Sequence, residues 1–245
     1  DVKAFFNDYY APSNAILVIA GNVTLSEAQR LCTKWFAPIE DHSTNKRIIP
    51  KEPKQTQSRH IDLKAQVPQN AIYKAYHVPG RISNQYQVND LLSDILGRGK
   101  SSLLHQIGVK KSQMFSSLSS YVTGNIDPGL MIISGRLSDN ITFENAEKTL
   151  ANAFQELSTQ SSESLKKVKN MAASSITFGE IDLLSRAMSL AYSTNLGNTD
   201  LVNKEIDIIE AVTEKDLKSA IHKTLLESNC TTLYYHKNQV YETHH

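Results

Sequence analysis

Cysteine is scarce in this chain of 245 residues, which contains only Cys32 and Cys230. Two cysteines so far apart in sequence exclude a domain built on a disulfide framework and a CxxC zinc knuckle. Both lie in apolar patterns, which favours reduced thiols inside a core. Long hydrophobic runs are also missing: no stretch of about 18 apolar residues occurs, which excludes a transmembrane helix.

An excess of charge of one sign is absent as well. The chain carries 26 Lys and Arg against 25 Asp and Glu, for a formal net charge of +1. Such a balance gives no field that would attract nucleic acid or anionic lipid, so we expect neither as a partner. The densest cationic run, 166–169, falls in a helical pattern and is interpreted as a solvated face. With 40% hydrophobic residues, the chain suits one large globular domain or one domain with an appendage.

Catalytic signatures are missing too. Of the eight histidines, only His244 and His245 are close in sequence, and they stand at the chain end. A zinc site needs ligands that converge, such as two His at i and i+4 of one helix, so no intrinsic zinc site is predicted. There is no G-x-S-x-G elbow, and Cys32 lies on the apolar face of its predicted helix.

The stretch LGRGKSSLL, residues 96–104, contains the tail of a phosphate-binding loop. The complete loop is G-x-x-x-x-G-K-[ST] between a strand and a helix, where backbone N–H groups surround the phosphates. Its first glycine would fall at Asp94, and the preceding segment has the periodicity of a helix. A turn between two helices that uses Gly97 and Gly99 is therefore favoured over a nucleotide site.

Hydrophobic periodicity predicts alternating helices and strands. Strands are expected at 14–23, 58–66, 70–78, 115–122, 130–134 and 230–236, and the last strand is expected to pair with the first. Helices are expected at 2–10, after the capping residues Thr24 and Glu27, at 84–97 with a short one near 103–107, through much of 143–196, and from Thr213. No short internal repeat is visible. The predicted fold class is α+β, with a mixed, largely antiparallel sheet covered by helices.

The segment FSSLSSYVTG, residues 115–124, predicts a strand with small polar side chains on one face. A solvated sheet face explains this pattern. An exposed sheet edge or face that lies against an extended peptide explains it as well, and the sequence leaves both interpretations open.

Three stretches together resemble the pitrilysin, insulinase and mitochondrial processing peptidase family of zinc metallopeptidases, the inverzincins. Residues 5–39 resemble the family's F-x-x-x-Y-Y-x-P-x-N junction, which closes one homologous domain and opens the next. Residues 94–135 resemble the glycine turn, helix, strand and D-x-G hairpin of the second domain, and 212–223 match its late helix. The resemblance implies a metallopeptidase-type domain that faces a similar domain across a peptide-holding chamber.

The family's zinc motif, H-x-x-E-H with a distant Glu, does not occur in this chain. The resemblance places it in a preceding catalytic domain, so we expect no cofactor here and zinc in the full-length protein. Family members also grip substrate with an Arg and a Tyr, whose positions here are Val109 and Ser116, and Leu103 stands where relatives carry another Arg. Neither gripping role is carried over, and catalytic residues are predicted to be absent.

The resulting prediction is the second, non-catalytic domain of a zinc metalloendopeptidase. Residues 1–13 would end a linker helix from the catalytic domain, 14–238 would form the second domain, and 239–245 a flexible tail. The expected partners are that catalytic domain and a peptide, and a homo-oligomer is possible. The alternative is a catalytically inactive homologue that serves as a structural or partner subunit. The compartment is left open, with the cytoplasm preferred to the periplasm. The predicted peptide-binding residues are Phe115, Ser116, Ser117 and Ser119.

Overall fold

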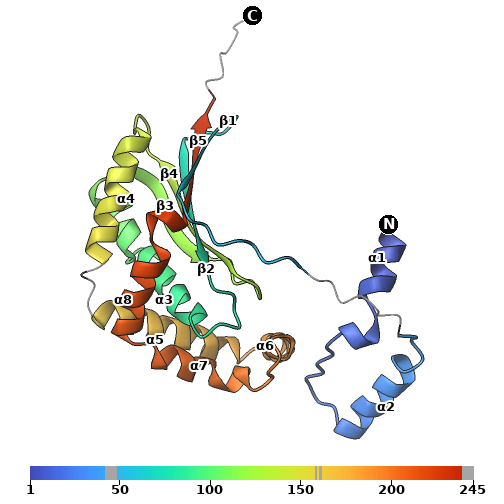
Figure 1. The fold of residues 1–245 in the computed structure, drawn as a ribbon. Coiled ribbons are helices and arrows are strands. Elements are labelled where there is room, and N and C mark those ends of the chain that lie inside the picture. Colours follow the sequence, from blue (N-terminus) through green and yellow to red (C-terminus); the bar gives the residue numbers. More distant parts are fainter. Residues whose placement is uncertain (42–48, 158, 160–161, 239–245) are drawn as a thin grey trace, which may run out of the picture. The chain divides into compact units, whose positions relative to one another are not determined.

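The computed structural model describes residues 1–41, 49–157, 159 and 162–238. Its contacts divide the chain into two units, each of which is described by itself. One unit comprises residues 1–53 and 174–205, and the other comprises 54–173 and 206–245. The second unit contains the sheet (Figure 1). The predicted tail at 239–245 lies outside the described residues.

The sheet has five strands in the order β1-β5-β2-β4-β3. Their bounds are Arg59–Ala65 (β1), Ala71–Val78 (β2), Phe115–Val122 (β3), Gly129–Leu137 (β4) and Cys230–Lys237 (β5). β1 and β5 run parallel, and the other neighbours run antiparallel. The predicted α+β class with a mixed, largely antiparallel sheet is therefore confirmed.

Alternation along the strands gives the sheet one buried face. On β2, Ile72 and Tyr76 are buried, and on β4 Met131 and Ile133 are buried, because period-two side chains point to the same side. Helices α3 (Tyr86–Gly97), α4 (Phe143–Leu157) and α8 (Glu214–Thr224) lie on that side (Figure 1). The core forms between these helices and the sheet.

The end of α3 packs closely on β3. Leu92 and Leu96 of α3 are fully buried, and each such side chain contributes about 1.5–3 kcal/mol of burial free energy. At the C-terminal residue of the helix, a Cβ on Gly97 would overlap the backbone of Ser120. Gly99, with φ of 79°, makes the predicted turn, and a helix rather than a strand precedes it.

Further elements belong to the second unit besides the last part of α7 (Leu201–Ala211). They are a π-helical segment η2 (His105–Lys111), the short 3-10 turn η3 (Glu227–Asn229) and the first part of α5 (Ser162–Gly179). The predicted cap before α8 is confirmed as a full capping box, in which Thr213 and Asp216 bond each other's backbone N–H.

The first unit contains α1 (Val2–Tyr9), the 3-10 turn η1 (Pro12–Asn14), α2 (Leu25–Trp35) and α6 (Leu183–Asn195). The predicted helices are present, and Thr24 caps α2 by accepting a bond from the Glu27 N–H. The predicted strand at 14–23 is wrong, because these residues form no strand. Its predicted pairing with β5 is wrong as well, because β1 and β2 occupy both sides of β5. None of the helices in the described ranges is long and apolar enough to cross a membrane.

Candidate functional site

The predicted peptide-binding residues lie on β3, at one edge of the sheet. In the described part of the chain, β3 pairs with β4 alone. Ser116, Ser117 and Ser119 are exposed, whereas the Phe115 side chain is only 1% exposed. Phe115 therefore anchors the strand in the core, and the serines are the members of the predicted set that a ligand could reach.

A β-bulge lies at the start of this edge. Phe115 pairs with Leu137 and Ser117 with Arg136, so that Ser116 is the extra residue between them. The Ser116 hydroxyl donates to Gln69 Oε1 at 3.2 Å. Bulges increase local twist and occur often at sheet edges and beside binding sites.

Backbone groups of β3 point away from β4 at alternate residues, but Leu118 and Ser120 are each only 5% exposed, and Gly97 of α3 lies against the Ser120 backbone. Thr123 N–H donates to Leu130 O at 2.9 Å, which fixes the alternation of the antiparallel ladder. Tyr121 and Ser119 then bond towards β4, while the N–H and C=O groups of Leu118 and Val122 point away from it. Val122 is the partly exposed residue of this set, and unpaired backbone groups at an accessible sheet edge are a template for an added strand.

The two positions where relatives carry gripping residues are not equivalent in structure. Val109 lies partly exposed in η2, and Ser116 is the bulge residue. The neighbouring Gly108 sits against Phe115 and Leu118, so the chain of η2 approaches β3 closely. Neither side chain supplies a cation or an aromatic ring here.

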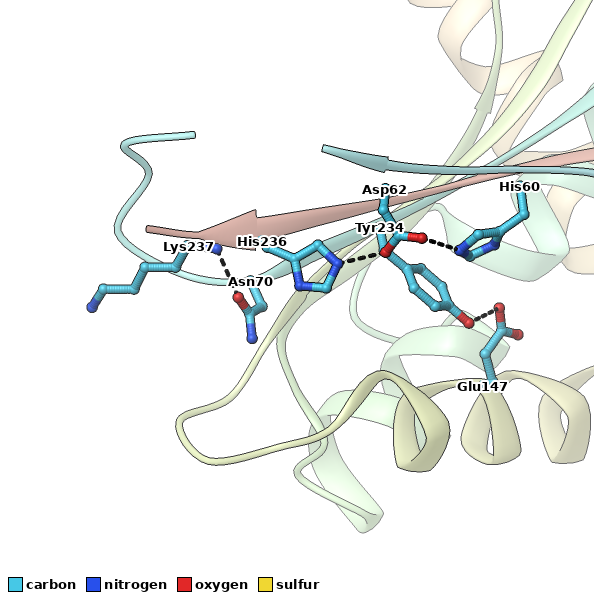
Figure 2. A network of polar contacts seen from close by, with 7 residues as sticks. All are labelled: His60, Asp62, Asn70, Glu147, Tyr234, His236 and Lys237. Carbon is cyan, nitrogen blue, oxygen red and sulfur yellow. Dashed lines mark hydrogen bonds and ion pairs between the residues drawn. The ribbon is translucent and has the colours of Figure 1, made fainter. Parts of the chain in front are cut away.

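A polar cluster at the other edge of the sheet, formed by β1 and β5, was not predicted from the sequence (Figure 2). Asp62 on β1 lies between two imidazoles: its Oδ1 is 2.6 Å from His236 Nε2, and its Oδ2 is 2.9 Å from His60 Nε2. Tyr234 donates to Glu147 Oε1 on α4 at 3.2 Å. The parallel pairing of β1 with β5 brings these groups together.

Lys74 on β2 joins this cluster to β5 and α4 through two polar contacts. Its ammonium group lies 2.7 Å from Glu147 Oε1 and donates to Thr232 Oγ1 at 3.0 Å. The side chain of Lys74 is only 12% exposed and that of Glu147 is 29% exposed. A charge held in such surroundings is stable only with its partner, so each group depends on the other.

The environment shifts the pKa of several of these groups. The hydrogen bond from His236 lowers the pKa of Asp62, and His60 adds to this effect. Burial, with the Glu147 carboxylate as second cause, raises the pKa of Tyr234 to about 12. Burial also raises the pKa of Tyr76. At neutral pH the tyrosines are therefore donors and Asp62 is a carboxylate.

An open cleft of about 570 Å³ adjoins the cluster, lined by residues from β1, β2, α4 and β5 that include Arg59, His60, Lys74 and Glu147. Within it, Lys74 pairs with Glu147, and His60 contacts Asp62. The imidazoles of His60 and His236 each contact a different oxygen of the Asp62 carboxylate, so they do not converge on one position where a metal ion could bind both. Among the residues that the structure describes, no group of three or more His, Cys, Asp or Glu is placed to hold a metal ion.

The fold, the bulged edge and the sequence landmarks define a class of protein. Residues 1–172 match the family model described as the peptidase M16 inactive domain, so the chain belongs to that family. This confirms the resemblance stated above, since the M16 peptidases are the zinc peptidases it named. The five-stranded α+β architecture is the fold of that class.

Individual relatives with known sequences or structures support the same family assignment. The zinc protease PqqE of Helicobacter pylori is 28% identical over 162 residues, which cover 64% of this chain and 36% of that protein. The crystal structure of a protease from Helicobacter pylori superposes with a TM-score of 0.85 at 23% identity, over 96% of this chain and 58% of that one. A peptidase M16 inactive domain from Pseudomonas fluorescens superposes with a TM-score of 0.80 at 20% identity, over 96% and 56% of the two chains. This chain therefore spans a third to somewhat over half of these relatives.

Proposed function

We propose that this chain is the non-catalytic second domain of a zinc metalloendopeptidase and forms one wall of a peptide-holding chamber. The zinc ligands and the general base would lie in a preceding catalytic domain of the same protein. Membership of the M16 inactive-domain family and the similarity to a zinc protease support this proposal. In this role, the domain contributes binding and orientation of the peptide, and not chemistry.

The observation that carries the proposal is the position of β3 at the edge of the sheet, with β4 as its one neighbour among the described strands. An extended peptide can add to this edge near its C-terminal end, with its main chain bonded to the outward groups of the partly exposed Val122. The exposed Ser117 and Ser119 are small, so that they allow a peptide to approach without selecting particular side chains. This domain would therefore bind peptides of varied sequence.

The test is a pair of substitutions at Val122 in the complete protein. Val122→Pro removes the outward N–H but no bond to β4, and proline is tolerated at such edge positions. Val122→Ala keeps the N–H and serves as the control. Loss of one peptide bond of about 1 kcal/mol should raise KM about fivefold in the proline variant, with kcat and zinc content unchanged. Equal KM values for the two variants would refute binding at this edge.

The second candidate is an inactive homologue that serves as a partner subunit. The observation in its favour is the replacement of both gripping positions by Val109 and Ser116. It predicts that the complete protein contains no zinc and cleaves no peptide, with or without a chelator. Zinc content and chelator-sensitive cleavage therefore separate the two functions.

A further inference from the structure

The sheet has a second edge, formed by β1, and it is the more exposed of the two. In the described part of the chain, β1 pairs with β5 alone. Every residue from 59 to 64 is exposed, whereas Leu118 and Ser120 at the β3 edge are each only 5% exposed. A further strand can therefore reach β1 along nearly its whole length.

One hydrogen bond fixes which backbone groups of β1 face outward. The Asn238 N–H donates to Ala65 O at 2.9 Å, so the backbone groups of Ala65 face β5. Because the direction of these groups alternates along a strand, those of His60, Asp62 and Lys64 point away from β5. Unpaired backbone groups at an exposed edge are a template for a further strand.

The two faces of β1 differ in chemistry. Figure 2 shows His60 and Asp62 on the same side of the sheet as Glu147 of α4. The opposite face carries Ile61 and Leu63, which are 51% and 47% exposed. A strand beside β1 would thus meet polar groups on one face and apolar side chains on the other.

The cleft of about 570 Å³ reaches this edge on the α4 face, since Ser58 and His60 contribute to its lining. Phe154 of α4 and Leu225, just after α8, also line the cleft and are partly exposed. Their side chains offer apolar surface beside the ion pair described above. Ligand sites in proteins commonly have volumes of about 300–1,000 Å³. The cleft is therefore large enough for a bulky side chain of a strand added to β1.

Charge selects a second feature of such a strand. Asp62 is already held by two imidazoles, whereas the exposed Lys64 has no polar partner among the described residues. An acidic side chain opposite Lys64 would pair with it. Antiparallel pairing is the more stable orientation, and in it the residue opposite Lys64 comes four positions before the residue opposite His60. The matching sequence is an acidic residue, three others and a bulky apolar residue beside the cleft.

A second copy of this chain does not meet these requirements. Its own β1, added antiparallel, would place His60, Asp62 and Lys64 on the α4 face. None of these is a bulky apolar side chain, so the cleft would stay unfilled. The partner is therefore a peptide of different sequence.

We propose that the β1 edge and the adjoining cleft bind an extended peptide that runs antiparallel to β1. The peptide places a Phe or Tyr side chain in the cleft and, four positions earlier, an Asp or Glu side chain opposite Lys64. Main-chain bonds to the edge supply affinity, and the cleft supplies selectivity. The inference goes beyond the proposed function, because this site lies at the other edge of the sheet and requires neither zinc nor β3.

The test uses the complete protein, with a chelator present to prevent cleavage, and the fluorescently labelled peptide TVEVTVFVT as the probe. Fluorescence anisotropy measures its dissociation constant. Replacing the phenylalanine of the probe by alanine should weaken binding at least tenfold, because the burial of a bulky apolar side chain is lost. The inference is overturned if the probe shows no saturable binding, or if the two peptides bind equally well.

Matched variants then locate the bound probe. Ala151→Phe fills the cleft from an exposed position of α4 and should raise the dissociation constant at least tenfold. Asn152→Phe, at the next exposed residue, which does not line the cleft, is the control and should leave it unchanged. Lys64→Glu should weaken binding of the probe and strengthen binding of a probe with lysine in place of glutamate. Equal effects of the two phenylalanine variants would show that the cleft is not occupied.

Two further measurements separate this site from its alternatives. Val122→Pro should bind the probe as the parent protein does, and a loss of binding there would place the peptide at β3 and contradict the inference. If the probe fails to bind, the proposal for β3 still stands, because its own test is made at Val122. Amide exchange at His60, Asp62 and Lys64 should slow when the probe binds. Slow exchange there without the probe, lost on dilution, would show that a second copy occupies the edge and would overturn the inference.

Discussion

Replacing Gly97 by alanine tests how the end of α3 is seated on the candidate binding strand. The added Cβ would lie 2.6 Å from the Cα of Ser120, whereas carbon atoms in contact normally stay about 3.5–4.0 Å apart. The backbone of Ser120 cannot relieve this overlap by rotating about a side-chain bond, as a flexible side chain could. The backbone N of Ser120 would lie closer still to this Cβ, so the helix end must move from β3 by roughly 1.5 Å, which loosens the fully buried Leu96.

The magnitude follows from two opposed effects. Overpacking against a rigid partner costs about 3 kcal/mol, at the upper end of its usual range. The better helix propensity of alanine offsets about 1 kcal/mol of this. We expect Gly97→Ala to lower the free energy of unfolding by about 2 kcal/mol. Gly179→Ala is the control: no atom lies within 4 Å of its Cβ, so it should be neutral or stabilise by up to about 1 kcal/mol.

Urea titrations followed by far-UV circular dichroism measure both variants against the parent protein. The packing predicts a lower midpoint for Gly97→Ala and an equal or higher midpoint for Gly179→Ala. If the two variants behaved alike, the close approach of α3 to β3 would not be a stabilising feature, and the reasoning would be refuted.

Two further predictions concern the cluster between β1, β5 and α4. Glu147→Ala leaves the poorly exposed Lys74 ammonium without its carboxylate and should cost about 3 kcal/mol of unfolding free energy in urea titrations. Glu144→Ala, which removes an exposed pair from the same helix, should leave the free energy of unfolding nearly unchanged, and similar losses in the two variants would contradict the difference in burial. Asp62 has a lowered pKa in the folded protein, so its contribution is present above the ordinary aspartate pKa and is lost as the pH falls through the lowered one. In Asp62→Asn the loss of stability on acidification should accordingly be smaller than in the parent, and identical pH profiles would exclude this coupling.

Local signals in the sequence predicted most individual elements. The alternation in β2, the turn residues between β3 and β4 and the capping box at Thr213 each depend on residues close in sequence. The glycine turn after α3 was predicted for the same reason. Because these patterns are local, they could be interpreted without knowing what packs against them.

The arrangement of strands could not be predicted in this way. Pairing of β5 between β1 and β2 joins residues far apart in the chain, and no local pattern encodes it. The contacts of Asp62 with His60 and His236 follow from that pairing, so the cluster was missed. The strand predicted at 14–23 failed because an apolar run needs neighbouring strands to form a sheet.

The most direct test of the central claim is amide exchange along β3 in the complete protein, with and without an extended peptide and with a chelator present to prevent cleavage. The account predicts that the peptide slows exchange at Val122, whose N–H group points outward and whose residue is partly exposed. Exchange at Ser119 and Tyr121 should stay unchanged, because their N–H groups are already bonded to β4. Unchanged exchange at Val122 when the peptide is bound would contradict peptide binding at this edge.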